Sequence, residues 1–191
     1  MRLGIESDTI SSLGRAGHDI GLGAMIGGNL FARVAMHPSL AEIGDERERG
    51  KVLNRSWQRY GPVNLAALGA VVAGWAGARL DEASPRMLSE RERFLALAKD
   101  LAVAAVAVTG IASAVEGIRF ARSEAAGAVP MATGDHTAED ASTLSRTRKR
   151  RVNRLGAAHL AAAMSLAAIN AGLGQANFRR PPARRLLRRR Y

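Results

Sequence analysis

A few polar and charged residues lie near or within long apolar stretches, where such groups usually pair with one another or serve a function. Three of them lie near one border of the apolar region, on the side where the two ends of the chain are expected: Asp19, Arg79 and Asp100. The lengths of the apolar stretches place these three side chains at a similar depth. We therefore expect the Arg79 guanidinium to neutralise one of the two carboxylates.

A second group of polar residues lies toward the opposite edge: Arg33, Asn64, Glu116 and His159. Arg33 follows Asp19 by 14 residues and Glu116 follows Asp100 by 16, so Arg33 and Glu116 occupy near-equivalent depths. We predict an ion pair between Arg33 and Glu116 from different helices. The alternative is that these side chains only extend to the water interface, with their apolar stems lying along the helices.

The residue types that support metal binding or catalysis lack the spacing that such sites need. His37, His159 and Glu116 are possible zinc ligands by type, but no short-spaced ligand motif joins them. His18 and Asp19 resemble a base and its orienting acid, but adjacent residues point away from each other on a helix. The chain contains no cysteine, which excludes disulfides and thiolate sites. We therefore predict no catalytic residue, no metal ligand, no cofactor and no enzymatic activity.

Four apolar segments must position the polar residues, and they cover residues 17–36, 62–80, 98–118 and 156–178. A run of 24 residues without a formal charge, 155–178, is long enough at ~1.5 Å per residue to cross a bilayer core of ~30 Å. The second and fourth segments are apolar on all faces, whereas a surface helix of a soluble protein needs a polar face. None of the four alternates polar and apolar residues as a strand does. The sequence thus predicts an all-α fold, a four-helix transmembrane bundle.

The composition bears on the choice between a membrane protein and a soluble basic one. Apolar residues make up 47% of the chain but aromatic residues only 4%, so few large side chains are available for a soluble core. The net charge of +11 invites an interpretation as a nucleic-acid-binding protein. The Lys and Arg residues, however, cluster at the edges of the apolar segments, as they do beside membrane helices. A soluble bundle with Ala-rich core helices is the alternative.

The starts of the apolar segments resemble one another in pairs. The second and fourth share the pattern R-x-x-x-R-x-G-x-x-[N/H]-L-A-A, which begins at Arg55 and at Arg150. The first and third share [H/K]-D-[I/L], which begins at positions 18 and 99. We therefore predict a duplicated two-helix hairpin, with copies at 14–80 and 95–178 and an axis along the membrane normal.

The connecting segments differ in composition. Residues 38–61 carry Trp57 and Tyr60 among several arginines, which predicts a short amphipathic helix at the membrane surface. An ordinary solvated helix that caps the bundle is the alternative. Residues 123–145 are rich in Ala, Gly, Ser and Thr, and we expect a flexible loop. The basic tail at 179–191 is expected to bind anionic lipid headgroups.

Several stretches of the sequence, including some of these residues, resemble those of a known group of proteins. His18-Asp19, His37-Pro38 and the stretch from Trp57 to Gly61 are similar to the first half of uncharacterised four-span integral membrane proteins of actinobacteria. Residues 98–100 and 153–170 are similar to the second half of those proteins. The resemblance implies four spans and a membrane location, and it implies no activity.

These observations lead to one preferred function and two alternatives. We predict a multi-pass protein of the cell membrane with cytoplasmic termini, acting as a non-enzymatic scaffold or packing module. Its expected partners are the lipid bilayer, anionic headgroups at the tail, and further copies of the chain in a homo-oligomer. The first alternative is a small transporter or channel with a polar path lined by Arg33, Asn64, Glu116 and His159. The second is a soluble protein that binds nucleic acid, which we do not expect.

Overall fold

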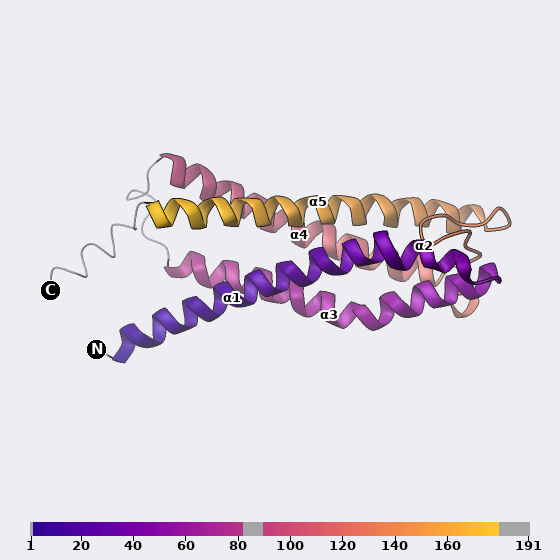
Figure 1. Ribbon diagram of the computed structural model, residues 1–191, viewed down its shortest axis with the longest axis horizontal. Coiled ribbons are helices and arrows are strands. Elements are labelled where there is room, and N and C mark those ends of the chain that lie inside the picture. Colours follow the sequence, from indigo (N-terminus) through magenta and orange to yellow (C-terminus); the bar gives the residue numbers. More distant parts are fainter. Residues whose placement is uncertain (1, 82–89, 180–191) are drawn as a thin grey trace.

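Four long helices lie side by side along one axis, as the ribbon of the computed structural model shows (Figure 1). The structure describes residues 2–81 and 90–179, so most of the predicted basic tail lies outside the described residues. The helices are α1 (Arg2–Phe31), α3 (Glu46–Asp81), α4 (Glu90–Ala121) and α5 (Thr143–Arg179). The prediction of an all-α helical bundle is confirmed.

The helices form two closely packed pairs. Helix α1 packs mainly along α3 and α4 mainly along α5, while contacts between α1 and α5 and between α3 and α4 close the bundle. The N-terminal end of α1 and the C-terminal end of α5 lie at the same end of the molecule (Figure 1). We call this the terminal end, and the opposite end, where residues 122–142 connect α4 to α5, the cap end.

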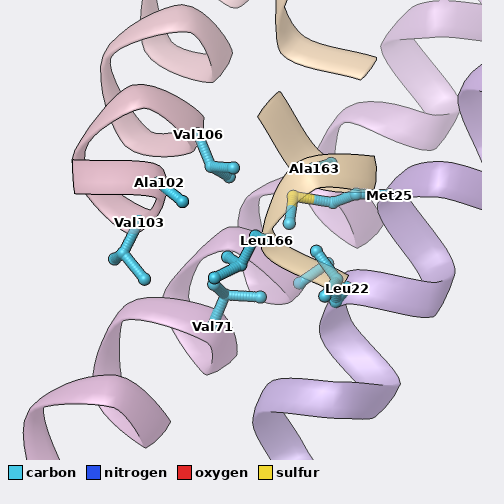
Figure 2. Close-up of a cluster of buried hydrophobic side chains, with 9 residues drawn as sticks. Leu22, Met25, Val71, Ala102, Val103, Val106, Ala163 and Leu166 are labelled. Carbon is cyan, nitrogen blue, oxygen red and sulfur yellow. The ribbon is translucent and has the colours of Figure 1, made fainter. Parts of the chain in front are cut away.

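All four long helices contribute to a central core (Figure 2). Its buried residues are aliphatic, and many are small: Leu22, Met25, Ala67, Val71, Ala102, Val103, Val106, Ala163 and Leu166. Glycines let α1 and α3 approach closely, because a Cβ atom at Gly74 would overlap the carbonyl oxygen of Gly14. Small side chains at helix contacts allow this kind of backbone approach.

The end of α1 continues through several short helical turns rather than a loop. A π-helical turn (Ala32–Met36) is followed by α2 (His37–Ser39) and a 3₁₀ turn (Leu40–Glu42). The backbone N–H of His37 donates to the carbonyl oxygen of Ala32, five residues earlier. Pro38 lies in the first turn of α2.

The short amphipathic helix predicted for residues 38–61 is wrong as a separate element. Helix α3 begins at Glu46 and continues through Pro62 to Asp81. Asp45 starts it, because its carboxylate accepts hydrogen bonds from the backbone N–H groups of Arg47 (2.7 Å) and Glu48 (2.9 Å). Packing on α1 supports the helix beside the proline, where the Tyr60 hydroxyl donates to the carbonyl oxygen of Ala24 at 2.8 Å.

Residues 122–142, which we call the cap, pack against the bundle, so the expected flexible loop is wrong. Val129 and Met131 are fully buried, in a second apolar cluster that includes Leu53 and Phe120. The backbone N–H of Met131 donates to Glu46, and the Asn54 side-chain amide donates to Gly127. A mostly polar segment is therefore held by two apolar anchors and by hydrogen bonds to α3. The cap also contains a 3₁₀ turn, η4 (Ala125–Gly127).

Candidate functional site

At the terminal end, Asp100 is the centre of a polar contact between α3 and α4. The indole Nε1 of Trp75 donates to Oδ1 of Asp100 at 2.7 Å, and Nε of Arg79 donates to the same oxygen at 3.0 Å. Nη2 of Arg79 forms an ion pair with the other carboxylate oxygen. The structure thus brings Arg79 together with Asp100, one of the two carboxylates considered from the sequence.

Asp19 has a different partner, on the other side of the bundle. The side-chain amide of Asn170 on α5 donates to Oδ1 of Asp19 at 2.9 Å. Nδ1 of His18 lies 3.2 Å from the same oxygen and 3.1 Å from the amide nitrogen of Asn170. The expectation that His18 and Asp19 point apart is wrong, because the ring folds back toward its neighbour. Nδ1 accepts from Asn170 when it lacks a proton and donates to Asp19 when it carries one.

The two aspartates are bound in a reciprocal way. Trp75 on α3 contacts Asp100 on α4, while Asn170 on α5 contacts Asp19 on α1. Trp75 and Asn170 are 95 positions apart, the same separation as Arg55 and Arg150 in the shared sequence pattern. Asp19 and Asp100 are 81 positions apart. A residue of the second helix in each predicted copy therefore reaches the aspartate of the first helix in the other copy.

The central core contains residues at the same two separations. Leu22 and Val103 are 81 positions apart, and Val71 and Leu166 are 95 positions apart. All four side chains are buried in the same cluster (Figure 2). The shared sequence patterns do not include these pairs, because the residues of each pair differ in type.

Toward the cap end, the predicted ion pair between Arg33 and Glu116 is wrong. Among the described residues, the buried Glu116 carboxylate pairs with Arg119 on its own helix at 3.4 Å. Nη2 of Arg33 instead lies 3.5 Å from the carbonyl oxygen of Asn153 on α5. The number of residues along each helix fixes the depth of the two side chains but not the direction in which each one points.

A buried polar cluster near the cap was not predicted. Nδ1 of His37 lies 2.9 Å from Oδ1 of Asp135, although the two residues are 98 positions apart. The side-chain amide of Asn153 donates to the backbone carbonyl of Asp135 at 2.8 Å. Lys149 is 4% exposed, and its ammonium group lies 5.6 Å from the centre of the Phe120 ring. The two contacts of Asp135 fasten the cap to α2 and α5, and the contact of Lys149 with Phe120 joins α5 to α4.

Burial and neighbouring charges shift two pKa values in this cluster. Burial lowers the pKa of Lys149 from 10.5 to about 8, with Arg33 adding to this effect and Asp135 opposing it. Burial also lowers the pKa of His37, as does the charge of Lys149, while Asp135 raises it. Both residues lie outside the uncharged run at 155–178. The basic run around Lys149 predicts a solvated side chain there. Lys149 nevertheless lies on the buried face of α5, which also contains His159 and Ala163.

Asn64 and His159 lie inside the bundle between the two ends. Nδ1 of His159 lies 3.3 Å from Oγ1 of Thr109, and Gly110 gives the ring space, since a Cβ there would lie 3.0 Å from Cε1. Oδ1 of Asn64 and Nε2 of His159 are buried without a hydrogen-bond partner among the described residues. Unsatisfied buried polar atoms are uncommon in proteins and cost free energy.

The predicted site residues therefore form several small contacts rather than one constellation. Arg79 with Asp100, and Asp19 with Asn170, connect helices at the terminal end. The remaining four residues are distributed along the bundle: Arg33, Asn64, Glu116 and His159. These contacts join the helices through hydrogen bonds and ion pairs.

Comparisons of the chain with known protein families, with curated proteins and with solved structures find no match. In the described part of the chain, two helices are long and apolar enough to cross a membrane, at Arg93–Ala121 and Thr143–Gln175. Their most apolar windows are only 22% and 17% buried within the bundle.

Proposed function

We propose that the chain is a multi-pass membrane protein that acts as a non-enzymatic scaffold or packing module. The observation that carries this proposal is the low burial of the two apolar helices. A core helix of a soluble protein is apolar because it is buried, whereas here only 22% and 17% of the apolar windows of α4 and α5 are covered. A lipid environment accounts for an apolar surface that the bundle leaves uncovered.

The exposed face of α4 carries most of the large apolar side chains of that helix. Seven of them follow alternating spacings of three and four residues, with one gap of seven: Phe94, Leu97, Leu101, Val108, Ile111, Val115 and Ile118. Their exposed fractions range from 41% to 70%. The buried face of the same helix holds smaller residues such as Ala102 and Val106. Large side chains on the exposed face and small ones in the central core suit a helix that faces lipid and packs closely on its neighbours.

We extend the proposal to four spans, with α1 and α3 beside α4 and α5. Large apolar side chains are exposed on both helices, including Ile20 and Phe31 on α1 and Val63 and Leu65 on α3. The N-terminal end of α1 and the C-terminal end of α5 lie at the same end of the bundle, which fits an even number of spans (Figure 1). We keep the prediction of cytoplasmic termini, which places the cap on the outer side, and of association into homo-oligomers.

We also propose that the bundle arose by duplication of a hairpin. The reciprocal contacts of Trp75 with Asp100 and of Asn170 with Asp19 support this. Such contacts are expected when two copies are related by a two-fold axis along the bundle. The resemblance to the actinobacterial four-span proteins stays a prediction.

The scaffold proposal is preferred to a transporter because of the close packing between helices. A Cβ atom at Gly21 would lie 2.6 Å from the carbonyl oxygen of Ala67, and glycine contacts of this kind bring the backbones of α1 and α3 together. One observation favours the transporter, namely the unpaired Oδ1 of Asn64 and Nε2 of His159. Solute uptake into liposomes that H159A and N64A both abolish would support the transporter. If liposomes that contain the wild-type protein take up no solute, the result supports the scaffold.

Extraction of native membranes with alkaline carbonate tests the membrane proposal. The chain is expected to stay in the pellet until detergent is added. As a matched comparison, I111K and V108K introduce charges on the exposed face of α4, whose side chains make no core contacts, and should reduce membrane retention. A wild-type chain that leaves the membrane in carbonate would exclude the proposal and favour the soluble nucleic-acid-binding alternative.

A further inference from the structure

Four arginines gather where α4 and α5 meet near the cap end. Arg119 lies in the last turn of α4 and Arg122 directly after the end of that helix, while Arg148 and Arg151 are one turn apart on α5. Nη1 of Arg148 donates to the backbone carbonyl of Arg119, which brings the two pairs together. Arg119, Arg122 and Arg151 lie at the surface, and Arg148 is half-buried. We call these four residues the arginine corner.

The arginine corner carries more positive charge than the protein itself neutralises. In the described part of the chain, Glu116 is the one carboxylate within 4.0 Å of any of the four guanidinium groups, and it pairs with Arg119 at 3.4 Å. Like charges on neighbouring turns of two packed helices repel one another, and an anion bound among them relieves this repulsion. Arginine favours phosphate groups, because its planar guanidinium donates two parallel hydrogen bonds to their oxygens.

An apolar strip begins directly next to the arginine corner. On α4, Val115 and Val108 precede Arg119 by four and eleven residues, which places them along the same side of the helix, and they are 41% and 67% exposed. On α5, Leu155 and Ala158 follow Arg151 by four and seven residues. Because α4 and α5 run in opposite directions, both strips extend from the arginines toward the terminal end.

We infer that the arginine corner and this strip bind an anionic phospholipid, with its phosphate between the guanidinium groups and its acyl chains along the apolar strip. Cationic groups above an apolar surface match the two parts of such a lipid. A free phosphate would use only the first part, and a nucleic acid would leave the apolar strip exposed. The inference rests on the proposed membrane location and adds a specific lipid to it.

Thermal unfolding of the full chain in lipid nanodiscs tests the inference. Adding phosphatidylglycerol to phosphatidylcholine nanodiscs should raise the Tm of the wild type by about 4 °C. R122Q/R151Q should lose at least half of this rise, and it removes no side-chain hydrogen bond or ion pair formed among the described residues. R122K/R151K keeps the charge and should keep most of the rise.

The matched control is R55Q/R59Q on α3. It also removes two exposed arginines from the cap-end half of the bundle, on a helix that α5 does not contact closely. This variant should keep the full lipid-dependent rise in Tm. Equal losses in the two Gln double variants, or a wild type that does not respond to phosphatidylglycerol, would overturn the inference.

Two further probes separate the possible anions. Inorganic phosphate or a short DNA duplex, added to phosphatidylcholine nanodiscs, should give a much smaller rise in Tm than phosphatidylglycerol. A rise of equal size with either probe would overturn the assignment to a lipid. A chain that enters nanodiscs but ignores phosphatidylglycerol contradicts only this inference, whereas a chain that leaves membranes in carbonate contradicts the proposed function itself.

Discussion

The indole of Trp75 donates a 2.7 Å hydrogen bond to Asp100, and Asn170 makes the corresponding bond to Asp19 at 2.9 Å. Each bond joins a helix of one predicted hairpin to a helix of the other. The terminal end of the bundle is therefore held together by two polar contacts, and each of them joins the two predicted hairpins. Hydrogen bonds between helices have this role where an apolar environment gives the helices little reason to associate.

Removal of the indole N–H at Trp75 should weaken the terminal end. W75F keeps an aromatic ring but removes the indole donor to Asp100 and leaves its contact with Arg79 in place, and we expect a loss of about 2 kcal/mol, typical of a hydrogen bond to a charged group. Thermal or denaturant unfolding in detergent would measure it. W57F is the control, since the Trp57 indole donates no hydrogen bond to the described residues, and it should cost clearly less. Similar losses for the two variants would argue against the role of the Asp100 bond.

Charge exchange should distinguish the ion pair that forms from the one that does not. R79D and D100R should each destabilise the protein, and the double variant R79D/D100R should recover part of the loss because the pair is restored in reverse. R33E and E116R should each destabilise it as well, but their double variant should show no recovery. Double-mutant cycles of membrane accumulation and unfolding would test both pairs. Recovery for the second pair would mean that Arg33 and Glu116 do interact.

Lys149 should make stability depend on pH in the alkaline range. Its pKa is about 8 in the folded protein and 10.5 as the ordinary value, so the unfolded chain binds more protons between these values. The stability should therefore rise with pH from about 8 to 10.5, by about 3 kcal/mol in total for this residue. Below pH 8 the full cost of the buried charge is present.

The comparison of wild type with K149M isolates this effect from the other groups that titrate in the same range. K149M should be more stable than the wild type near pH 7, and its advantage should shrink as the pH rises toward 10.5. Unfolding in detergent across this range would measure the difference. A difference that does not change with pH would show that Lys149 is not buried in its charged form.

The approach of α1 to α3 should depend on Gly74. A Cβ atom there would overlap the backbone oxygen of Gly14 and lie 2.8 Å from Cβ of His18, so we expect G74A to cost about 2 kcal/mol. A Cβ atom at Gly77, one turn later, would have nothing within 4 Å, and G77A should stabilise the helix by up to about 1 kcal/mol. Opposite signs in unfolding experiments support the packing of the two helices. A neutral G74A would contradict it.

The helices and the depth of their polar residues could be predicted because both follow from local sequence. The lengths of the apolar runs set the helices, and the number of residues along them brings Arg79 to the level of Asp100. The angular direction of a side chain depends on how the helices pack, which explains the wrong pair of Arg33 with Glu116. Lys149 lies on the inward stripe of α5, and this helical spacing is the sequence signal that could have identified it.

The cap could not be predicted, because its contacts join residues far apart in the chain. Asp135 contacts His37 across 98 positions, and the segment has a composition typical of a flexible loop. Val129 and Met131 are the two large aliphatic side chains that the cap buries, and two residues form no pattern that a sequence reveals. The continuous helix through Pro62 was missed for a related reason, since tertiary packing on α1 outweighs the local effect of the proline.

The central claim, that the exposed face of α4 lies in lipid, can be measured directly because the chain has no cysteine of its own. A spin label on I111C, in the middle of that face, and one on S142C, in the cap, would be compared in liposomes. We predict that the label at position 111 collides often with oxygen and rarely with a water-soluble nickel complex, and that the label at position 142 shows the reverse. Free access of the nickel complex to position 111 would contradict the membrane location of this helix.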